Sequence, residues 1–428
     1  MSFQQGLSGL NVSSNALNTI GNNIANSGTV GFKGANAQFS DIYAASLNGT
    51  GASQIGIGAN MSSVFQQFTQ GNLTTTGNPL DLAINGGGFY RLSDASGTSA
   101  GNASYTRNGQ FLINKDGYIV NSAGLYLTGL QADPATGIVP DSGQPGGIKL
   151  DTSLIDPNAT TTSEIGLNLD SRKGVPANAP FDPTDPLSYT SSTTQTVYDS
   201  LGNPHNFQMY FVKSATANTW SMYTQLDGDS TTLNDPTVNA AATGPITLNF
   251  NASGALTGTP AMPLTLWPAT GYPLATTTGA ANLTFTVDLQ GSTQYGQDFG
   301  VNALNQDGYT SGRLSGVAVS SDGTIQGQYS NGRTRDMGRL VLATFQNPNG
   351  LQNVGGNLWR ETADSGQPIV GAPGQGNLGV IQSSTVEDSN VDLTAELVDM
   401  IVQQRAYQAN AQTIKTQDQI LQTLVNLR

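Results

Sequence analysis

Few residues in this chain are of the types that carry catalysis. Its 428 residues include a single histidine, His205, and no cysteine. One histidine excludes a histidine dyad or a histidine-rich metal site, and the lack of cysteine excludes disulfides, thiolate metal ligands and a cysteine nucleophile. Because His205 directly follows Pro204, we predict that it is a turn residue.

Pairs of carboxylates could act as the acid and base of a glycosidase. Asp182 and Asp185 form one close pair in the sequence, and Asp227 and Asp229 form another. Each pair lies in a stretch rich in proline or glycine, where aspartate is expected for turn formation. We therefore interpret both pairs as turn residues and predict no enzymatic activity.

Two further motifs match ligand-binding loops only in part. Residues 305–308, Asn-Gln-Asp-Gly, resemble the start of a calcium-binding loop but lack its distal glutamate. Residues 86–88 are three glycines, but the Lys-Ser/Thr pair of a phosphate-binding loop is missing and a strand pattern comes next. We predict a hairpin turn at residues 86–88, no metal site and no cofactor.

The composition indicates a polar protein with unusually few charges. Charged residues make up 11% of the chain, against about 25% in an average soluble protein, and 52 residues are glycine. The net charge of -13 argues against nucleic acid as a partner. No basic signal-peptide region precedes the first charged residue, Lys33, and no apolar run approaches about 18 residues. We expect no membrane insertion, and a route other than general secretion if the protein leaves the cell.

Apolar residues recur every seven positions at both ends of the chain, a spacing typical of coiled-coil helices. We therefore predict helices over residues 1–29 and 389–428 that form a terminal coiled-coil domain, with Ser389 and Asn390 capping the second helix. The residues that we assign to subunit assembly are Phe3, Leu7, Leu10, Leu17, Ile20, Ile24, Leu393, Leu397, Met400, Ile401, Tyr407, Ile414, Leu421 and Leu424.

Two helices alone do not account for all of this apolar surface. The C-terminal seam offers about seven side chains at roughly 1.5–3 kcal/mol each, or about 15 kcal/mol. Ordering the segment from Leu393 to Arg428 costs on the order of 50 kcal/mol before hydrogen bonds are counted. Pairing with the N-terminal helix would also leave Val398, Ile401 and Ile420 uncovered. We expect neighbouring subunits to cover them; an ordinary intramolecular helical hairpin is the alternative.

The middle of the chain has the pattern of β-structure. Residues 30–72 and 380–388 lack regular periodicity and are interrupted by glycines, which predicts an extended connector. Strand patterns predict a β domain in two pieces, 73–148 and 308–379, with an outer β domain, 149–307, inserted between them. The predicted fold class is α+β, mainly β, with two β-rich domains, one inserted in the other. We expect strands at residues 80–84, 89–92, 109–113, 118–120, 194–198, 207–212, 220–225, 247–250, 283–289, 316–319, 324–329 and 339–345.

Several segments resemble the axial proteins of the bacterial flagellum, the family of rod, hook and related subunits. Residues 20–33, IGNNIANSGTVGFK, are similar to the N-terminal signature of the family, and residues 389–393, SNVDL, with 400–401 and 404–407, to its C-terminal signature. Residues 80–89 and 105–111 resemble its first β segments. The signature residues are Asn22, Asn23, Ala25, Asn26, Gly31, Phe32, Lys33, Ser389, Asn390 and Val391.

Within this family, three segments resemble hook subunits rather than rod subunits. They are residues 199–205, DSLGNPH, the stretch 306–332, and residues 343–351, ATFQNPNGL. The inserted outer domain points the same way, since rod subunits are shorter and lack it. Another axial subunit, such as one of the distal rod, is the alternative within the family.

The resemblance implies a structural subunit that polymerises with itself into the tubular flagellar hook, a universal joint that carries torque from rod to filament. It implies export through the flagellar type III apparatus, growth beneath a hook cap protein, contacts with rod and hook–filament junction proteins, and an extracellular location. The terminal helices would form the inner tube and the β domains its outer layers. The alternative from another class is a secreted β-rich enzyme or adhesin, but such a protein has no need for two uncharged or glutamine-rich heptad ends.

Overall fold

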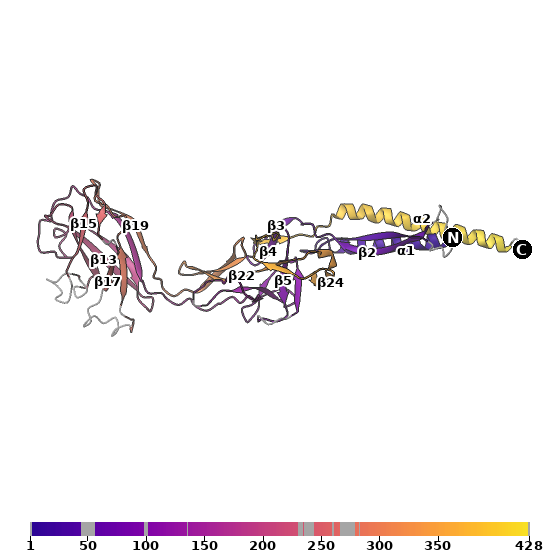
Figure 1. Cartoon of the computed structure of the whole chain (residues 1–428), viewed down its shortest axis with the longest axis horizontal. Coiled ribbons are helices and arrows are strands. Elements are labelled where there is room, and N and C mark those ends of the chain that lie inside the picture. The colour runs from indigo at the N-terminus through magenta and orange to yellow at the C-terminus, as the bar shows by residue number, and fades with distance from the viewer. Residues whose placement is uncertain are drawn as a thin grey trace. The chain divides into compact units, whose positions relative to one another are not determined.

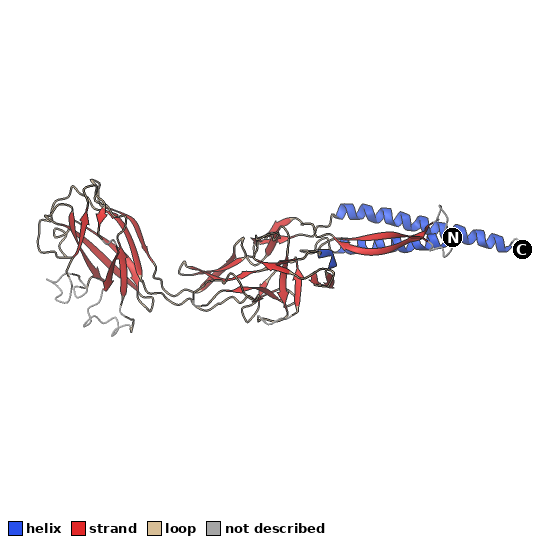
Figure 2. Ribbon diagram, in the orientation of Figure 1, coloured by secondary structure: helices blue, strands red, loops and turns tan. Residues whose placement is uncertain are grey.

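The fold is mainly β, with one long helix near each end of the chain. The computed structural model describes residues 2–43, 56–97, 102–134, 136–229, 234, 244–258, 261–265, 279–281 and 283–426. Helix α1 spans Ser2–Ala25 and helix α2 spans Leu393–Asn426 (Figure 2). No helix in these ranges is both long and apolar enough to span a bilayer. The predicted mainly β class with terminal helices is confirmed.

The chain divides into two compact units. Unit 1 comprises Met1–Thr152, Ser315–Gln328 and Thr334–Arg428, and unit 2 comprises Ser153–Leu314 and Tyr329–Arg333. Unit 1 therefore holds both helices together with the segments that we assigned to the connector and to the first β domain. The finer domain borders stay a prediction.

A long hairpin in unit 1 lies within residues 30–72, the first part of the predicted extended connector. Strand β1 (Ala35–Tyr43) pairs antiparallel with β2 (Gly56–Gln66). The hairpin packs on α1 (Figure 1): the Ser8 hydroxyl accepts a hydrogen bond from Ala59 N at 2.8 Å, and Gln5 Nε2 donates to Gly56 O at 2.7 Å. The expected strands did not include these two, because their residues are largely polar and are held by pairing with each other and by hydrogen bonds to the neighbouring helix.

The main sheet of unit 1 is built from short strands on both sides of unit 2 in the sequence. Its central path runs β20 (Leu314–Val319), β21 (Thr324–Tyr329), β22 (Thr334–Leu340), β9 (Tyr126–Gln131), β5 (Phe89–Ser93), β6 (Ala103–Thr106), β25 (Leu358–Arg360) and β24 (Gln352–Gly355). Branches add β7 (Leu112–Ile113), β8 (Ile119–Val120), β10 (Gly146–Gly147), β23 (Leu342–Thr344) and β26 (Ile369–Gly371). Two small ladders pair β4 (Leu82–Asn85) with β27 (Val380–Ser383) and β3 (Leu73–Thr75) with β28 (Thr385–Glu387).

This topology corrects two local predictions. Residues 86–88 do not form a hairpin, because β4 pairs with β27 while β5 belongs to the main sheet, so the three glycines carry the chain from one sheet to another. The predicted strand 339–345 is divided at Val341, since β22 pairs with β9 and β23 pairs with β5 and β26.

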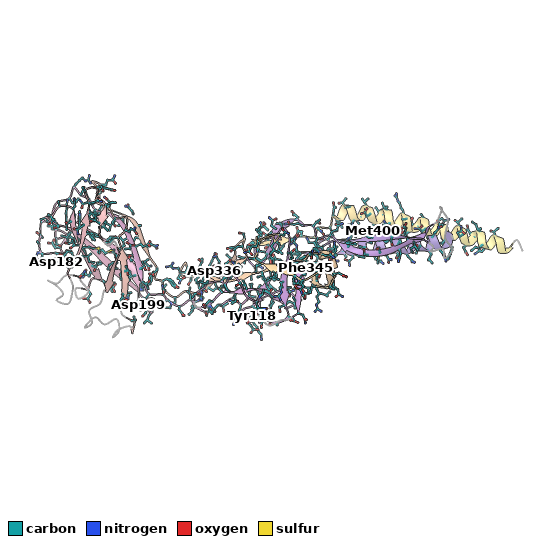
Figure 3. All side chains as sticks on the ribbon, viewed as in Figure 1. Tyr118, Asp182, Asp199, Asp336, Phe345 and Met400 are labelled. Carbon is teal, nitrogen blue, oxygen red and sulfur yellow. The ribbon has the colours of Figure 1, made fainter. Side chains whose placement is uncertain are left out.

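Aromatic rings fill part of the core of unit 1. Phe89, Tyr105, Ala343, Phe345 and Trp359 form one buried cluster, and the Tyr105 and Phe345 rings meet edge to face at 4.7 Å. Phe345 is labelled in Figure 3. Such large side chains provide much apolar burial per residue, which a sheet made of very short strands needs. The cluster joins β5 and β6 to the later strands β23 and β25.

Unit 2 consists of two packed sheets. One has the order β17 (Ala261–Thr265), β18 (Thr284–Asp288), β11 (Thr162–Asn168), β19 (Gly300–Gln306). The other has the order β12 (Ser191–Tyr198), β13 (Pro204–Lys213), β14 (Thr219–Leu226), β15 (Ile246–Phe250), β16 (Leu256–Thr257). A single buried cluster takes Ile165 and Val287 from the first sheet and Phe207, Trp220 and Leu248 from the second, as expected for a β-sandwich.

His205 lies on a strand and not in a turn as predicted. It is the second residue of β13, with Nδ1 2.6 Å from Asp227 Oδ2 and Nε2 3.4 Å from Asp199 Oδ2. The turn that follows β12 is closed by Asp199 Oδ1, which accepts hydrogen bonds from the backbone N–H groups of Leu201 and Asn203. The histidine therefore links this turn to the end of β14.

Three carboxylates of unit 2, those of Asp170, Asp199 and Asp307, have lowered pKa values, which predicts that the unit loses stability in acid. The Arg172 side chain lowers the pKa of Asp170 from 3.8 to about 2. Burial opposes ionisation of Asp199 and Asp307, but hydrogen bonds from Asn203 and Thr161 outweigh it and lower both pKa values. Because the folded pKa values lie below those of the unfolded chain, this stabilisation is complete above about pH 4 and is lost as the pH falls through the folded values toward 2.

The measurement is the melting temperature from the near-ultraviolet circular dichroism of the full chain between pH 6 and pH 2. We expect a steep fall of the melting temperature below pH 4, and a shallower fall in Asp199→Asn, which removes one of the titrating groups. A melting temperature that stays constant down to pH 2 would contradict the prediction.

Candidate assembly surface and its anchor

The face of α2 that meets α1 is made mainly of polar and small residues. Half-buried residues recur every three or four positions along α2: Glu396, Met400, Gln403, Ala406, Asn410, Ile414 and Gln417. On α1 the buried residues are Gly6, Ser13, Ala16 and Asn23. A Cβ atom built on Gly6 would lie 3.0 Å from Ile414 Cγ1, and one on Gly9 2.7 Å from Asn410 Nδ2. The two helices are thus antiparallel and in close contact through small residues.

The opposite face of α2 exposes a patch of large aliphatic side chains. We define the outer patch as Leu393, Leu397, Val398, Ile401 and Val402, whose side chains are between 45% and 55% exposed. Residues spaced four apart lie on the same side of a helix, so these residues form one continuous surface over the first three turns. Beyond Val402 the same face carries Arg405, Gln408 and Gln412.

The apolar residues predicted for subunit assembly differ in their burial within the single chain. Of the C-terminal residues spaced by seven, only Met400 and Ile414 are half-buried, whereas Leu393, Tyr407 and Leu421 are exposed. On α1, Phe3 and Leu7 are exposed, and Leu10, Leu17, Ile20 and Ile24 are half-buried. The side chain of Leu424 lies outside the described residues. The predicted seam is therefore only partly covered within the chain: the exposed members include Phe3 and Leu7 on α1 and Leu393, Tyr407 and Leu421 on α2.

The β1–β2 hairpin also exposes large apolar side chains. Phe39, Ile42, Met61, Val64 and Phe65 are between 37% and 48% exposed. Soluble monomers rarely expose many large apolar side chains on neighbouring elements, and such surfaces usually mark sites of protein–protein contact. Met400 on α2 is labelled in Figure 3 next to the hairpin and α1.

Asn23 joins α1, α2 and the hairpin. Its side-chain amide donates to Ala35 O at 2.8 Å and to Glu396 Oε1 at 2.8 Å, and its Oδ1 accepts from Ala35 N at 2.9 Å. Asn23 is 2% exposed, so all of these hydrogen bonds are shielded from water. A buried amide with three partners fixes the start of β1 against both helices.

A buried cluster of charges anchors the helices to the sheets. We call Lys33, Arg107 and Glu387 the charge node; each is 4% exposed or less. Lys33 Nζ lies 2.6 Å from Glu387 Oε1, and Arg107 Nε lies 3.2 Å from Glu387 Oε2. Lys33 also donates to Thr69 O at 2.7 Å. Burial lowers the pKa of Lys33, although the negative charge and hydrogen bond of Glu387 oppose this.

The remaining hydrogen bonds of the charge node fix backbone segments on both sides of the hairpin. Gly31 N donates to Glu387 O at 2.7 Å, and Gly71 N donates to Glu387 Oε1 at 2.9 Å. Arg107 donates to Gly88 O at 2.7 Å and to Gly86 O at 2.9 Å. Glu387 therefore holds the chain just before β1 and just after β2, and Arg107 holds the crossing between β4 and β5.

Ser389 and Asn390 do not cap α2 as predicted. The N-cap is Asp392, whose Oδ1 accepts from Thr394 N at 2.9 Å and from Ala395 N at 3.2 Å. Asn390 instead accepts from Gly34 N at 2.8 Å and donates to Gln67 O at 2.7 Å. The Ser389 hydroxyl accepts from Val391 N at 3.3 Å. The cap was misassigned because a residue that suits a helix cap also suits a turn between two segments.

The structure does not bring all of the signature residues together. Asn23, Gly31, Lys33 and Asn390 belong to the junction between the helices and the sheets. Asn22 and Asn26 hydrogen-bond to each other at the end of α1, where Asn26 Nδ2 donates to Asn22 O at 2.9 Å. Ala25 is exposed, and Phe32 and Val391 are half-buried. Sequence reasoning missed Glu387 and the pairing of Arg107. The sequence feature that could have indicated them is Lys33, the only charged residue among the first 40, which needs a partner of opposite charge if it is buried.

Four family models match consecutive parts of the chain. They describe a flagella basal body rod protein (residues 3–33), the flagellar hook protein FlgE/F/G D1 domain (83–166), the flagellar basal body protein FlaE D2 domain (168–309) and the flagellar basal body rod FlgEFG protein C-terminal region (382–427). The matched ranges include nearly all of α1, all of α2 and nearly all of the strands of unit 2, whereas β1–β3 and β20–β26 of unit 1 lie outside them.

Curated relatives match over the full length. The flagellar hook protein FlgE of Salmonella typhimurium and that of Escherichia coli are each 43% identical over 434 residues, covering 100% of this chain and of the relative. FlgE of Borreliella burgdorferi is 32% identical over 466 residues, covering 100% of this chain and 99% of the relative. The crystal structure of the Helicobacter pylori flagellar hook protein FlgE2 has a TM-score of 0.52 at 15% identity, over 73% of this chain and 100% of that one, which supports the fold alone. The chain belongs to the flagellar hook protein family.

Proposed function

We propose that the chain is a structural subunit that polymerises into the tubular flagellar hook and acts there as part of a universal joint between rod and filament. The observation that carries this proposal is the outer patch, a surface of five large aliphatic residues on the side of α2 that faces away from α1. The intramolecular contact between the helices is already filled by Gly6, Ser13, Ala16 and Asn23. A second copy of the chain is the natural cover for the patch, and the two helices would then form the coiled-coil inner part of the tube.

The β-sheets of this subunit would form the outer layers of the tube. Their surface is polar but carries few charges, since only 11% of the whole chain is charged. Polar contacts between subunits can exchange at low cost, whereas desolvated ion pairs cannot. A tube of this kind can bend while its helices stay in contact. The proposed function requires no catalysis by any residue of the chain.

The proposal includes the partners and location of a hook subunit. Membership of the hook protein family supports export through the flagellar type III apparatus, growth beneath a hook cap protein, contacts with rod and hook–filament junction proteins, and an extracellular position on the flagellum. The inserted outer domain supports the hook over the distal rod.

Deletion of residues 393–428 tests the proposal. We expect the truncated chain to form no tubes when fragments of native hook are added as seeds, while the full chain does, because the truncation removes the outer patch. Sedimentation and electron microscopy measure assembly, and near-ultraviolet circular dichroism of the buried aromatic residues of both units checks that the β-sheets stay folded. Tube formation by the truncated chain at the level of the full chain would contradict the proposal.

A further inference from the structure

The charge node contains one more positive than negative charge in a site closed to water. Lys33, Arg107 and Glu387 are 1%, 4% and 1% exposed. Glu387 is the only carboxylate that forms a described ion pair with either cation. Arg107 Nε faces Glu387 Oε2 as an ion pair and not as an aligned hydrogen bond. Removal of Glu387 would therefore leave two buried cations with backbone carbonyls as their only described partners.

The residues of the charge node come from distant parts of the sequence. Lys33 lies just before the hairpin, Arg107 just after β6 and Glu387 at the end of β28, six residues before α2 begins. The N-terminal part of the chain supplies both cations, and the C-terminal part supplies the carboxylate. Glu387 also accepts hydrogen bonds from the backbone N–H groups of Gly31 and Gly71, which lie before and after the β1–β2 hairpin in the chain.

We propose that Glu387 is a positioning residue for assembly. Its carboxylate is the counter-charge of Lys33 and Arg107. The segments that connect α1 and α2 to the sheets therefore pack together only when the C-terminal segment has placed Glu387 between these two cations. The inference rests on the proposed function, since it concerns which form of the subunit can join the tube. Before docking, the two cations oppose packing of the hairpin against the sheets, because burial of an unpaired charge is strongly unfavourable. Docking removes this obstacle and fixes both helices together.

This role distinguishes Glu387 from Lys33, although the two share one contact. Glu387→Gln keeps the size of the side chain and an oxygen acceptor but leaves two buried cations without a counter-ion. Lys33→Met leaves Arg107 and Glu387 as a balanced pair. If the node were merely a set of packing contacts, both variants would lose the same bond and weaken assembly to a similar degree. The charge balance predicts a severe defect in the first and a mild one in the second.

The test measures the critical concentration for seeded assembly of the full-length chain. We expect Glu387→Gln to raise it by about tenfold or more, since only the fraction of subunits in the docked form can add to the tube. Lys33→Met should raise it by less than about threefold. The double variant Glu387→Gln/Lys33→Met should assemble better than Glu387→Gln alone, because one unpaired cation is gone. Glu164→Gln, an exposed carboxylate on β11, is the control and should not differ from the original chain.

Hydrogen exchange provides a second readout that does not depend on tube formation. In Glu387→Gln the amides of Gly31 and Gly71 should exchange faster, and protection should return in part in the double variant. The inference is overturned if Glu387→Gln assembles at the critical concentration of the original chain, or if adding Lys33→Met worsens its defect. Failure of the proposed function is a separate result, because it would appear as tube formation by the chain that lacks residues 393–428.

Discussion

A negative charge in the outer patch is expected to abolish tube formation without unfolding the subunit. Val398→Asp and Ile401→Asp replace side chains that are 55% and 50% exposed in the single chain, so neither change leaves a cavity in the core. In a tube the same positions would be covered by another copy, where an unpaired carboxylate costs several kcal/mol. We expect the critical concentration to rise by more than about a hundredfold for the double variant. Sedimentation of seeded samples measures it.

Gln412→Asp provides the matched control for this prediction. Gln412 is exposed on the same face of α2, beyond the end of the outer patch, and the change introduces a carboxylate of the same kind into the same helix, as a control for each single patch variant. We expect it to alter the critical concentration by less than about threefold. Circular dichroism should give the same helix content for all three proteins. Equal assembly of the patch variant and the control would show that the patch is not a contact surface.

The second large effect is expected at Gly109, which follows β6 in the chain and lies against Leu82 of β4 in unit 1. A Cβ atom at this position would overlap the carbonyl oxygen of Leu82, whose own N–H donates to Gly109 O at 2.9 Å. The overlapping atom belongs to the backbone, so a change of rotamer cannot relieve the clash. We expect Gly109→Ala to destabilise unit 1 by roughly 3 kcal/mol or more. Chemical denaturation of the full chain, followed by the fluorescence change of buried Trp359, measures the loss.

Gly77→Ala serves as the control for Gly109→Ala. A Cβ atom built on Gly77 meets no heavy atom within 4 Å, and its backbone does not require the left-handed region. The change should therefore leave the unfolding midpoint of unit 1 within error or raise it slightly. A loss of stability as large as that of Gly109→Ala would contradict the explanation by the contact with Leu82.

The sequence predicts the helices and many strands well, but it does not predict which residues they bury. The spacing of apolar residues in α2 correctly indicates a helix, yet it does not distinguish Met400 and Ile414, which are half-buried, from Leu393, Tyr407 and Leu421, which are exposed in the single chain. Periodicity identifies an apolar face without identifying its partner. The actual contact depends on Gly6 and Ser13, whose small side chains contribute little to any hydrophobic pattern.

Strands were missed where polar residues or glycine interrupt the alternation. In β11, Glu164 and Gly166 alternate with Ile165 and Leu167, so only two large apolar residues mark the strand in the sequence. Strand β1 reads Ala-Asn-Ala-Gln-Phe-Ser-Asp-Ile-Tyr, with few large apolar residues, and it is held by pairing with β2 rather than by burial. Pairing over many residues is a tertiary property that local propensity does not contain.

The charge node was also only partly predictable. Lys33 is the single charged residue among the first 40, and an isolated charge in such a segment indicates a buried partner. The sequence does not say that this partner lies 354 positions away at Glu387. Long-range ion pairs depend on how the sheets bring strands together, which here required the ladder of β3 with β28.

The close contact between α1 and α2 limits how the first residues of the chain can evolve. Gly6, Ser13 and Ala16 are buried against neighbouring elements, and a larger side chain at any of them would separate the helices whether it was polar or apolar. Side-chain volume therefore limits what these positions accept, and exchanges among glycine, alanine and serine are the ones expected to keep the helices in contact. Phe3 and Leu7 lie on the same helix but are exposed in the single chain, so their size does not set the distance between α1 and α2.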